Sequence, residues 1–249
     1  MNYKKFPDQY WNEISNTLEI LKKQNTPLVA AFDADGTLWD TDLGENFFQY
    51  QIDNKQVPLP EDPWKHYLDM KKINGDPRDA YIWLAQINKG VALATVQDWA
   101  QKAFDSIRPS PLFDEQKKLI ALLKSHGVKV YIVTASIRWA VEPGARAMGL
   151  SAEDVFGVET LVQDGLITDT KVLPITYRQG KVDALITKTN DLRPFLSSGN
   201  TIGDYELLQF ATHIKLAVSA ASRDDKLFKA ENELQGKATE HKWWGHRFI

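Results

Sequence analysis

Apolar and polar positions follow two different periods along this chain, and these periods predict helices and strands. Near the start, four apolar residues recur every three to four positions: Trp11, Ile14, Leu18 and Leu21. This spacing predicts an amphipathic helix over residues 9–23. Residues 26–33 instead form a short apolar run that a proline opens and Asp33 closes. Such a run is typical of a strand that is buried on both faces.

The stretch from about residue 43 to residue 107 has a different character. Helical patterns dominate it, most clearly over residues 80–87 and 96–104, and it is rich in Trp, Tyr and Phe. A structureless loop of this length is uncommon inside a compact domain. We therefore predict a helical lobe that is inserted directly after the first strand.

From residue 108 onward the patterns of helix and strand alternate. Helices are predicted over residues 115–127 (capped by Asp114), 139–149, 179–188 and 205–213. Strands are predicted over residues 128–136, 154–160, 200–204 and 214–220. Residues 161–170 are predicted to form a hairpin with its turn at Asp164-Gly165. This alternation predicts a Rossmann-like α/β fold, a mostly parallel sheet with helices on both faces. The expected domains are an α/β core of residues 1–42 and 107–249 and a helical lobe of residues 43–106.

Composition narrows the class of protein. Of the 249 residues, 43% are hydrophobic and 25% charged, an ordinary globular balance, and the net charge of −3 gives no footprint for a nucleic-acid partner. No apolar stretch approaches the length of a membrane-spanning helix, and the absence of cysteine excludes disulfides and thiolate chemistry. The N-terminus has no signal-peptide pattern, which predicts a cytoplasmic protein, although a chain whose leader had been removed would look the same. No feature indicates an oligomeric state.

Polar residues follow several of the predicted strands. Asp33 and Asp35 follow the first strand, Thr134 and Ser136 end the second, Lys181 begins a helix, and Asp204 ends the segment 200–204. In open α/β sheets, ligands bind beyond the carboxyl ends of the strands. We therefore expect these side chains to form one site.

This set of groups suits phosphoryl transfer. One carboxylate can attack phosphorus, and a second carboxyl two residues later can protonate the leaving oxygen and then activate water. A hydroxyl, an ammonium and backbone N–H groups can bind the phosphoryl oxygens. Because the site gathers negative charge, it needs a cation, and Mg²⁺ prefers such oxygen ligands.

These motifs resemble the haloacid dehalogenase-like phosphohydrolases. Residues 33–37, Asp-Ala-Asp-Gly-Thr, resemble the D-x-D-G-T signature of that family. This resemblance implies a nucleophile at Asp33 and a general acid/base at Asp35. The resemblance implies three further motif residues: Thr134 as phosphate ligand, Lys181 beside nucleophile and phosphate, and Asp204 as magnesium ligand with the Asp33 carboxylate and the Asp35 carbonyl. Gly36 is expected to let the backbone approach the phosphoryl group.

One departure from the family pattern concerns the fourth motif. A second acidic residue usually follows the first by four or five positions, where this chain has Leu208 and Gln209. Glu206 is acidic but lies at a different spacing. This departure implies weaker Mg²⁺ binding.

The inserted lobe resembles the cap of the phosphoserine phosphatase-like branch. The Asp-Leu-x-Glu run over residues 42–45, together with Thr-Ala-Ser over 134–136 in the second motif, is similar to phosphorylcholine phosphatase. In that branch an acidic residue nine positions after the nucleophile contacts the substrate ammonium, which implies this role for Asp42. Asp42 is also a natural helix N-cap, with Glu45 as its capping-box partner. Asp40 is expected to be a solvated turn residue. Four rings are candidates for an ammonium cage or for the core of the lobe: Trp39, Trp64, Tyr67 and Trp83.

The expected activity is Mg²⁺-dependent hydrolysis of a small phosphomonoester through an aspartyl-phosphate at Asp33. An amine-bearing substrate such as phosphoserine, phosphoethanolamine or phosphocholine is favoured, and a sugar phosphate is the enzymatic alternative. The competing class is a phosphate-binding relative without turnover, with a weakened metal site. In the C-terminal segment 241–249 we expect a docked aromatic terminus rather than a histidine metal site.

Overall fold

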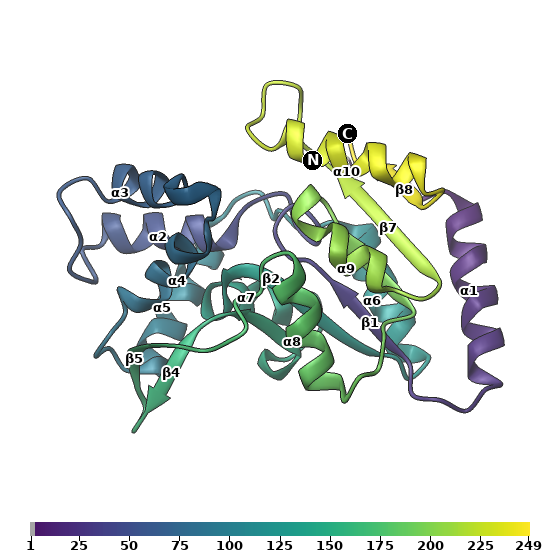
Figure 1. Ribbon diagram of the computed structural model, residues 1–249, viewed down its shortest axis with the longest axis horizontal. Helices are drawn as coiled ribbons and strands as arrows, with labels where there is room; N and C mark the ends of the chain where they lie inside the picture. Colours follow the sequence, from purple (N-terminus) through teal and green to yellow (C-terminus); the bar gives the residue numbers. More distant parts are fainter. Residues whose placement is uncertain (1–2) are drawn as a thin grey trace.

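The computed structural model describes residues 3–249, and its centre is a six-stranded sheet (Figure 1). The strand order is β3-β2-β1-β6-β7-β8, and every neighbouring pair is parallel. The strands are β1 (Val29–Phe32), β2 (Lys129–Ile137), β3 (Val155–Val158), β6 (Leu196–Gly199), β7 (Ile214–Ser219) and β8 (Trp244–Arg247). The predicted parallel α/β sheet is confirmed.

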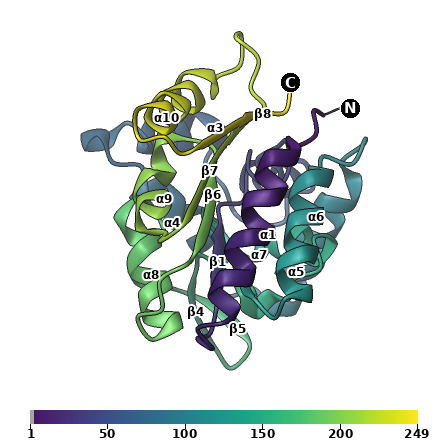
Figure 2. The same cartoon turned by 90° about the vertical axis from the view of Figure 1, so that its right-hand side faces the viewer.

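Helices cover both faces of this sheet (Figure 2). One face carries α1 (Asp8–Lys22), α6 (Asp114–Ser125) and α7 (Arg138–Ala147), and the other carries α8 (Gln179–Thr189), α9 (Tyr205–Phe210) and α10 (Phe228–Glu240). Successive side chains of a strand point to opposite faces. Accordingly, Ala30 and Phe32 pack into the cluster with α1 and α6, and Ala31 packs against α8 and α9. This double burial explains the unbroken apolar run of β1.

Between β1 and α6 the chain forms a helical segment, defined here as residues 43–106. It contains α2 (Leu43–Asp53), α3 (Pro63–Met70), the short helix η1 (Ile73–Gly75), α4 (Arg78–Gln86) and α5 (Leu93–Ser106). Phe47, Phe48 and neighbouring apolar side chains of the segment form a core cluster distinct from that of the sheet. No helix within residues 3–249 has both the length and the apolar content to cross a membrane.

The predicted hairpin is confirmed and packs against the helical segment. It consists of β4 (Thr160–Gln163) and β5 (Leu166–Lys171), and its turn residues Asp164 and Gly165 both have positive φ. Backbone hydrogen bonds join it to the loop before α5, with Gly90 donating to Ile167 at 2.8 Å. The hairpin and the helical segment thus share one apolar cluster, which includes Ile167.

Three expectations about local structure are wrong. Asp114 is the first residue of α6 rather than its cap, and the cap residue is Phe113. Residues 200–204 are not a strand, because β6 ends at Gly199 and a short helix, η3 (Ile202–Asp204), follows. The strands predicted from the sequence end with 214–220, whereas the structure has a further strand, β8, which pairs with β7. The expected docking of the aromatic terminus is confirmed: Phe248 is fully buried and stacks on Phe113.

Candidate active site

A cavity of about 600 Å³ lies at the carboxyl ends of β1, β2 and β6. It is bordered on one side by residues of the sheet loops and on the other by residues of the helical segment. All the site residues predicted from the sequence line it: Asp33, Asp35, Gly36, Asp42, Thr134, Lys181 and Asp204. The structure therefore brings these residues together, and their roles in catalysis stay predictions.

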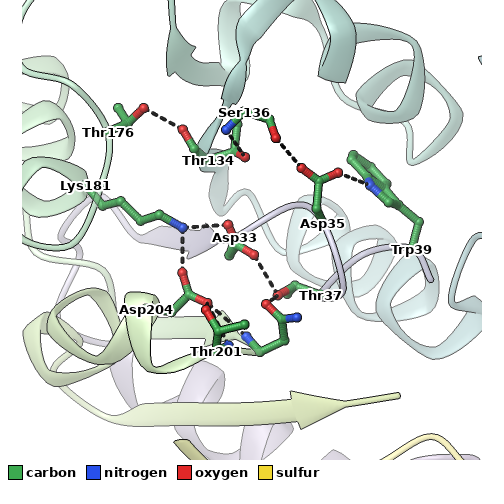
Figure 3. A network of polar contacts seen from close by, with 11 residues as sticks. Asp33, Asp35, Thr37, Trp39, Thr134, Ser136, Thr176, Lys181, Thr201 and Asp204 are labelled. Atoms are coloured by element: carbon green, nitrogen blue, oxygen red, sulfur yellow. Dashed lines mark hydrogen bonds and ion pairs between the residues drawn. The ribbon is translucent and has the colours of Figure 1, made fainter. Parts of the chain in front are cut away.

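Lys181 lies between two buried carboxylates (Figure 3). Its Nζ is 2.6 Å from Asp33 Oδ1 and 2.5 Å from Asp204 Oδ1. Asp33 directly follows β1, Lys181 is in the first turn of α8, and Asp204 ends η3. All three side chains are at least nine-tenths buried. One ammonium thus neutralises part of the charge of two carboxylates.

The remaining negative charge raises the pKa of Asp33. Burial and the neighbouring Asp204 raise the pKa of Asp33 to about 6, although the Lys181 ammonium lowers it. Burial disfavours a charged carboxylate, and a second carboxylate nearby adds to that cost. The cluster therefore lacks positive charge, which a bound cation would supply.

Three hydrogen-bond donors hold the carboxyl group of Asp35. Trp39 Nε1 and the Leu43 backbone N–H both donate to Oδ1, at 2.7 and 2.8 Å, and Ser136 Oγ donates to Oδ2 at 2.6 Å. Figure 3 shows the Trp39 and Ser136 contacts on opposite sides of this carboxyl. Burial raises the pKa of Asp35 to about 6 despite these donors. A carboxyl with such a pKa can both give and take a proton near neutral pH.

Thr134 and Gly36 supply the polar surface between these carboxylates. Thr134 lies near the carboxyl end of strand β2, before the chain enters α7, and its Oγ1 accepts a hydrogen bond from the Ser136 backbone N–H at 3.1 Å. Gly36 has a φ of +74°, which a residue with a Cβ rarely adopts. Both residues face the cavity, where a phosphoryl group would meet a hydroxyl and an open stretch of backbone.

Asn200 is a site residue that the sequence reasoning missed. It directly follows β6, and Thr37 Oγ1 lies 3.0 Å from Asp33 Oδ2 and 3.3 Å from Asn200 Oδ1. Its Nδ2 donates to Glu231 Oε1 at 3.1 Å, which fixes the orientation of the amide. The signal was weak, because residues 195–199 contain only two large apolar side chains, and β6 therefore does not stand out as the strand that places Asn200 at its end.

The carboxylate and amide oxygens at this edge of the sheet are suitable ligands for a hard cation such as Mg²⁺. Within the described part of the chain, no three His, Cys, Asp or Glu side chains form a ready ligand cluster. Carboxylate oxygens of Asp33 and Asp204 are nevertheless present, together with the amide oxygen of Asn200. Mg²⁺ takes such oxygen ligands and keeps several waters. The uncompensated charge at Asp33 is a second observation that fits a cation.

Asp42 caps α2, as the sequence predicts. Its Oδ1 accepts the backbone N–H of Glu45 at 2.7 Å. Glu45 does not return a capping-box bond, because its carboxylate contacts Lys71 at 3.4 Å and Lys226 at 2.6 Å. Burial, with Asp35 and Glu45 nearby, raises the pKa of Asp42 to about 8.

The aromatic lining of the cavity differs from the expected cage. Trp39 is fully buried in the core cluster of the sheet, and Trp64 and Trp83 pack on Phe48. None of these three tryptophans lines the cavity. The rings that do line it are Tyr67, Tyr81 and Tyr177. Asp40 is not simply solvated, since it accepts a hydrogen bond from Tyr3 at 2.9 Å and also lines the cavity.

Several known proteins are similar to this chain. Phosphorylcholine phosphatase of Pseudomonas aeruginosa is 22% identical over 212 residues, and the match covers 69% of this chain and 60% of that protein. A protein of unknown function from Bordetella pertussis has a similar structure, with a TM-score of 0.71, 16% identity, and coverage of 90% of this chain and 100% of that chain. A phosphoserine phosphatase solved as a phospho-aspartyl intermediate analogue gives a TM-score of 0.54, 17% identity, and coverage of 90% and 94%.

The structural matches share the α/β fold at low identity. Residues 30–209, which include Asp33, Thr134, Lys181 and Asp204, match the family described as haloacid dehalogenase-like hydrolase. This match covers well over half of the chain, and it contains the strand ends that build the cavity. The chain therefore belongs to the haloacid dehalogenase-like hydrolase family.

Proposed function

We propose that this protein is a magnesium-dependent phosphatase that hydrolyses a small phosphomonoester through an aspartyl-phosphate at Asp33. The observation that carries the proposal is the contact of Lys181 with both Asp33 and Asp204, in the cavity that Asp35 also lines. The lysine lowers the pKa of the buried Asp33 carboxyl and so keeps it available as a nucleophile. Family membership and the phosphatases among its relatives agree with this activity.

In the first step a carboxylate oxygen of Asp33 forms a bond to phosphorus while the bond from phosphorus to the leaving oxygen breaks. Asp35 gives its proton to that leaving oxygen, and the alcohol departs. In the second step Asp35 accepts a proton from water as the water oxygen attacks the phosphorus of the aspartyl-phosphate. The bond between Asp33 and phosphorus then breaks, and phosphate and the free carboxylate are released. The pKa of about 6 at Asp35 suits both steps.

Three residues bind the phosphoryl oxygens in this proposal. Lys181 offers its ammonium, Thr134 its hydroxyl, and the segment around Gly36 its backbone N–H groups. All three face the cavity beside Asp33. Because the transferred group carries negative charge, donors that are already in place stabilise it more than water would.

We propose that Mg²⁺ is held by the Asp33 carboxylate, the Asp35 backbone carbonyl and Asp204, with Asn200 as a further oxygen ligand. When bound, the ion supplies positive charge at the phosphoryl group. Asn200 and Asp204 are four positions apart, which is the usual spacing of the fourth motif. The motif can therefore begin at Asn200, and Leu208, fully buried under α10, needs no acidic counterpart.

The substrate in this proposal is an amine-bearing phosphomonoester. The helical segment 43–106 acts as a cap on the core formed by residues 1–42 and 107–249, and it contributes Glu45, Tyr67 and Tyr81 to the cavity. Asp42, at the junction of cap and core, offers a carboxyl group to the substrate ammonium. A sugar phosphate has no ammonium to pair with Asp42, so it gains no such contact.

The test is phosphate release from p-nitrophenyl phosphate with and without Mg²⁺, followed by a panel of amino-alcohol and sugar phosphates. We expect Mg²⁺-dependent turnover that Asp33→Asn abolishes, and a preference for amine-bearing esters that Asp42→Ala removes. Inorganic phosphate that binds without any turnover at saturating Mg²⁺ would identify a binding protein instead. A preference for sugar phosphates would contradict the role of Asp42.

A further inference from the structure

A lysine of this chain covers the aromatic surface of the cavity. Lys71 directly follows α3, and its Nζ lies 4.9 Å from the ring centroid of Tyr67 and 5.6 Å from that of Tyr81. It also lies 3.4 Å from Glu45 Oε1. Lys71, the two tyrosines and Glu45 all line the cavity, and the side chain of Lys71 is 30% exposed. The two tyrosine faces therefore already have a cation beside them.

The position of Lys71 affects different ammonium groups differently. A quaternary ammonium has no N–H to donate, so a protein binds it mainly through aromatic faces and opposite charge. Here the ammonium of Lys71 competes for the Tyr67 and Tyr81 faces and repels a second cation. A primary ammonium instead brings three N–H donors and needs acceptor oxygens rather than rings.

The cavity has an acceptor for a primary ammonium. Both oxygens of Glu45 are in use, one with Lys71 and one with Lys226. Asp42 uses Oδ1 to cap α2, and its Oδ2 accepts no hydrogen bond from residues 3–249. Because Asp42 lines the cavity, this oxygen is available to an N–H donor of a ligand.

We propose that Lys71 is a specificity-determining residue that selects phosphomonoesters of primary amines over those of quaternary ammonium alcohols. This inference rests on the proposed phosphatase function and sharpens its substrate class. The primary ammonium binds at Asp42, while Lys71 holds the tyrosine faces that a trimethylammonium group would need. The relative named phosphorylcholine phosphatase is only 22% identical, so a different choice of amine is compatible with that similarity.

Phosphoethanolamine and phosphocholine test this inference, since they differ only in three N-methyl groups. We would measure kcat/KM for both esters with the wild type, Lys71→Met and Lys71→Arg. The wild type should prefer phosphoethanolamine, and Lys71→Met should lower that preference by about tenfold, chiefly through a lower KM for phosphocholine. Lys71→Arg should keep the preference because it retains a cation over the rings.

Lys72→Met is the matched control. The neighbouring Lys72 is 77% exposed and pairs only weakly, at 3.5 Å, with Asp69 on the surface. Its replacement should leave both kcat/KM values unchanged. A wild type without preference for phosphoethanolamine, or a Lys71→Met variant with an unchanged ratio, overturns the inference while p-nitrophenyl phosphate is still hydrolysed. Loss of all phosphate release by the wild type would instead overturn the proposed function.

Discussion

Gly36 lies directly beneath the side chain of Asn200. A Cβ placed on Gly36 would be 2.0 Å from Asn200 Nδ2, far inside van der Waals contact. Asn200 cannot move away easily, because its amide is held between Thr37 and Glu231. The glycine of the first motif is therefore required by a residue at the end of the neighbouring strand β6, as well as by its own positive φ.

Gly36→Ala should therefore damage both stability and activity. We expect a loss of about 2–4 kcal/mol in the free energy of unfolding, from positive φ and steric overlap together. Urea denaturation monitored by tryptophan fluorescence measures this loss. Gly90→Ala is the matched control, since Gly90 also has positive φ but nothing lies within 4 Å of its Cβ position. Equal losses in the two variants would show that Asn200 does not constrain position 36.

Removal of the ammonium at position 181 should leave two buried carboxylates uncompensated. Lys181→Met is expected to lower the free energy of unfolding by about 3–5 kcal/mol, the usual cost of breaking a buried ion pair from one side. Adding Asp204→Asn should recover part of that loss, because one of the two charges is then gone. If the double variant is less stable than Lys181→Met alone, the two groups do not act as a pair. Lys65→Met, on an exposed pair with Asp69, should leave stability unchanged.

Asp42 should make the fold less stable as pH rises. Its pKa is raised to about 8 in the folded protein and lies near 4 in an unfolded chain. Between these values the folded state binds more protons than the unfolded state, so the free energy of unfolding falls as pH increases from about 4 through 8. Asp42→Asn removes this effect and keeps the α2 cap, since Asn caps as well as Asp.

We expect Asp42→Asn to be more stable than the wild type by about 1–3 kcal/mol at pH 7.5 and equal to it at pH 4. Thermal unfolding across this pH range measures the difference. Asp62→Asn is the control, because Asp62 caps α3 through the same bond to a backbone N–H, at an exposed position. A difference between Asp42→Asn and the wild type that does not change with pH would contradict the raised pKa.

Trp39 should affect catalysis through its hydrogen bond to Asp35. Trp39→Phe removes the indole donor at 2.7 Å while it keeps an aromatic ring in the core. If Asp35 is the proton donor, kcat should fall about tenfold for an alkyl phosphate. It should fall much less for p-nitrophenyl phosphate, whose leaving group needs little protonation. Equal losses for both substrates would indicate only a general disturbance of the fold.

The parts of the fold that were predictable follow from strong local patterns. The apolar run of β1, the helical period of α1 and the Asp164-Gly165 turn each specify local structure without knowledge of the rest of the chain. The motif residues were predictable because the carboxyl ends of parallel strands meet at one edge. Asp33, Thr134 and Lys181 accordingly line one cavity.

The features that escaped prediction depend on contacts distant in sequence. Lys71 has the pattern of an ordinary surface lysine. Tyr67 lies one turn earlier in the same helix, and only the packing of α3 against α4 brings Tyr81 to the same ammonium. The role of Asn200 depends on where β6 ends, and element boundaries are the weakest part of a sequence-based prediction. The tryptophans expected as a cage are large apolar groups, and all three pack in or against the core clusters instead.

A covalent intermediate at Asp33 can be trapped directly if its hydrolysis is slowed. Asp35→Asn should slow breakdown of the aspartyl-phosphate, whereas p-nitrophenyl phosphate can still form it because its leaving group needs no acid. We would quench this variant with acid during incubation with p-nitrophenyl phosphate and Mg²⁺ and locate the phosphoryl group by peptide mass spectrometry. We expect one phosphoryl group on Asp33, which is absent when Asp33→Asn is added. A phosphoryl group on another residue, or continued turnover in Asp33→Asn, would contradict it.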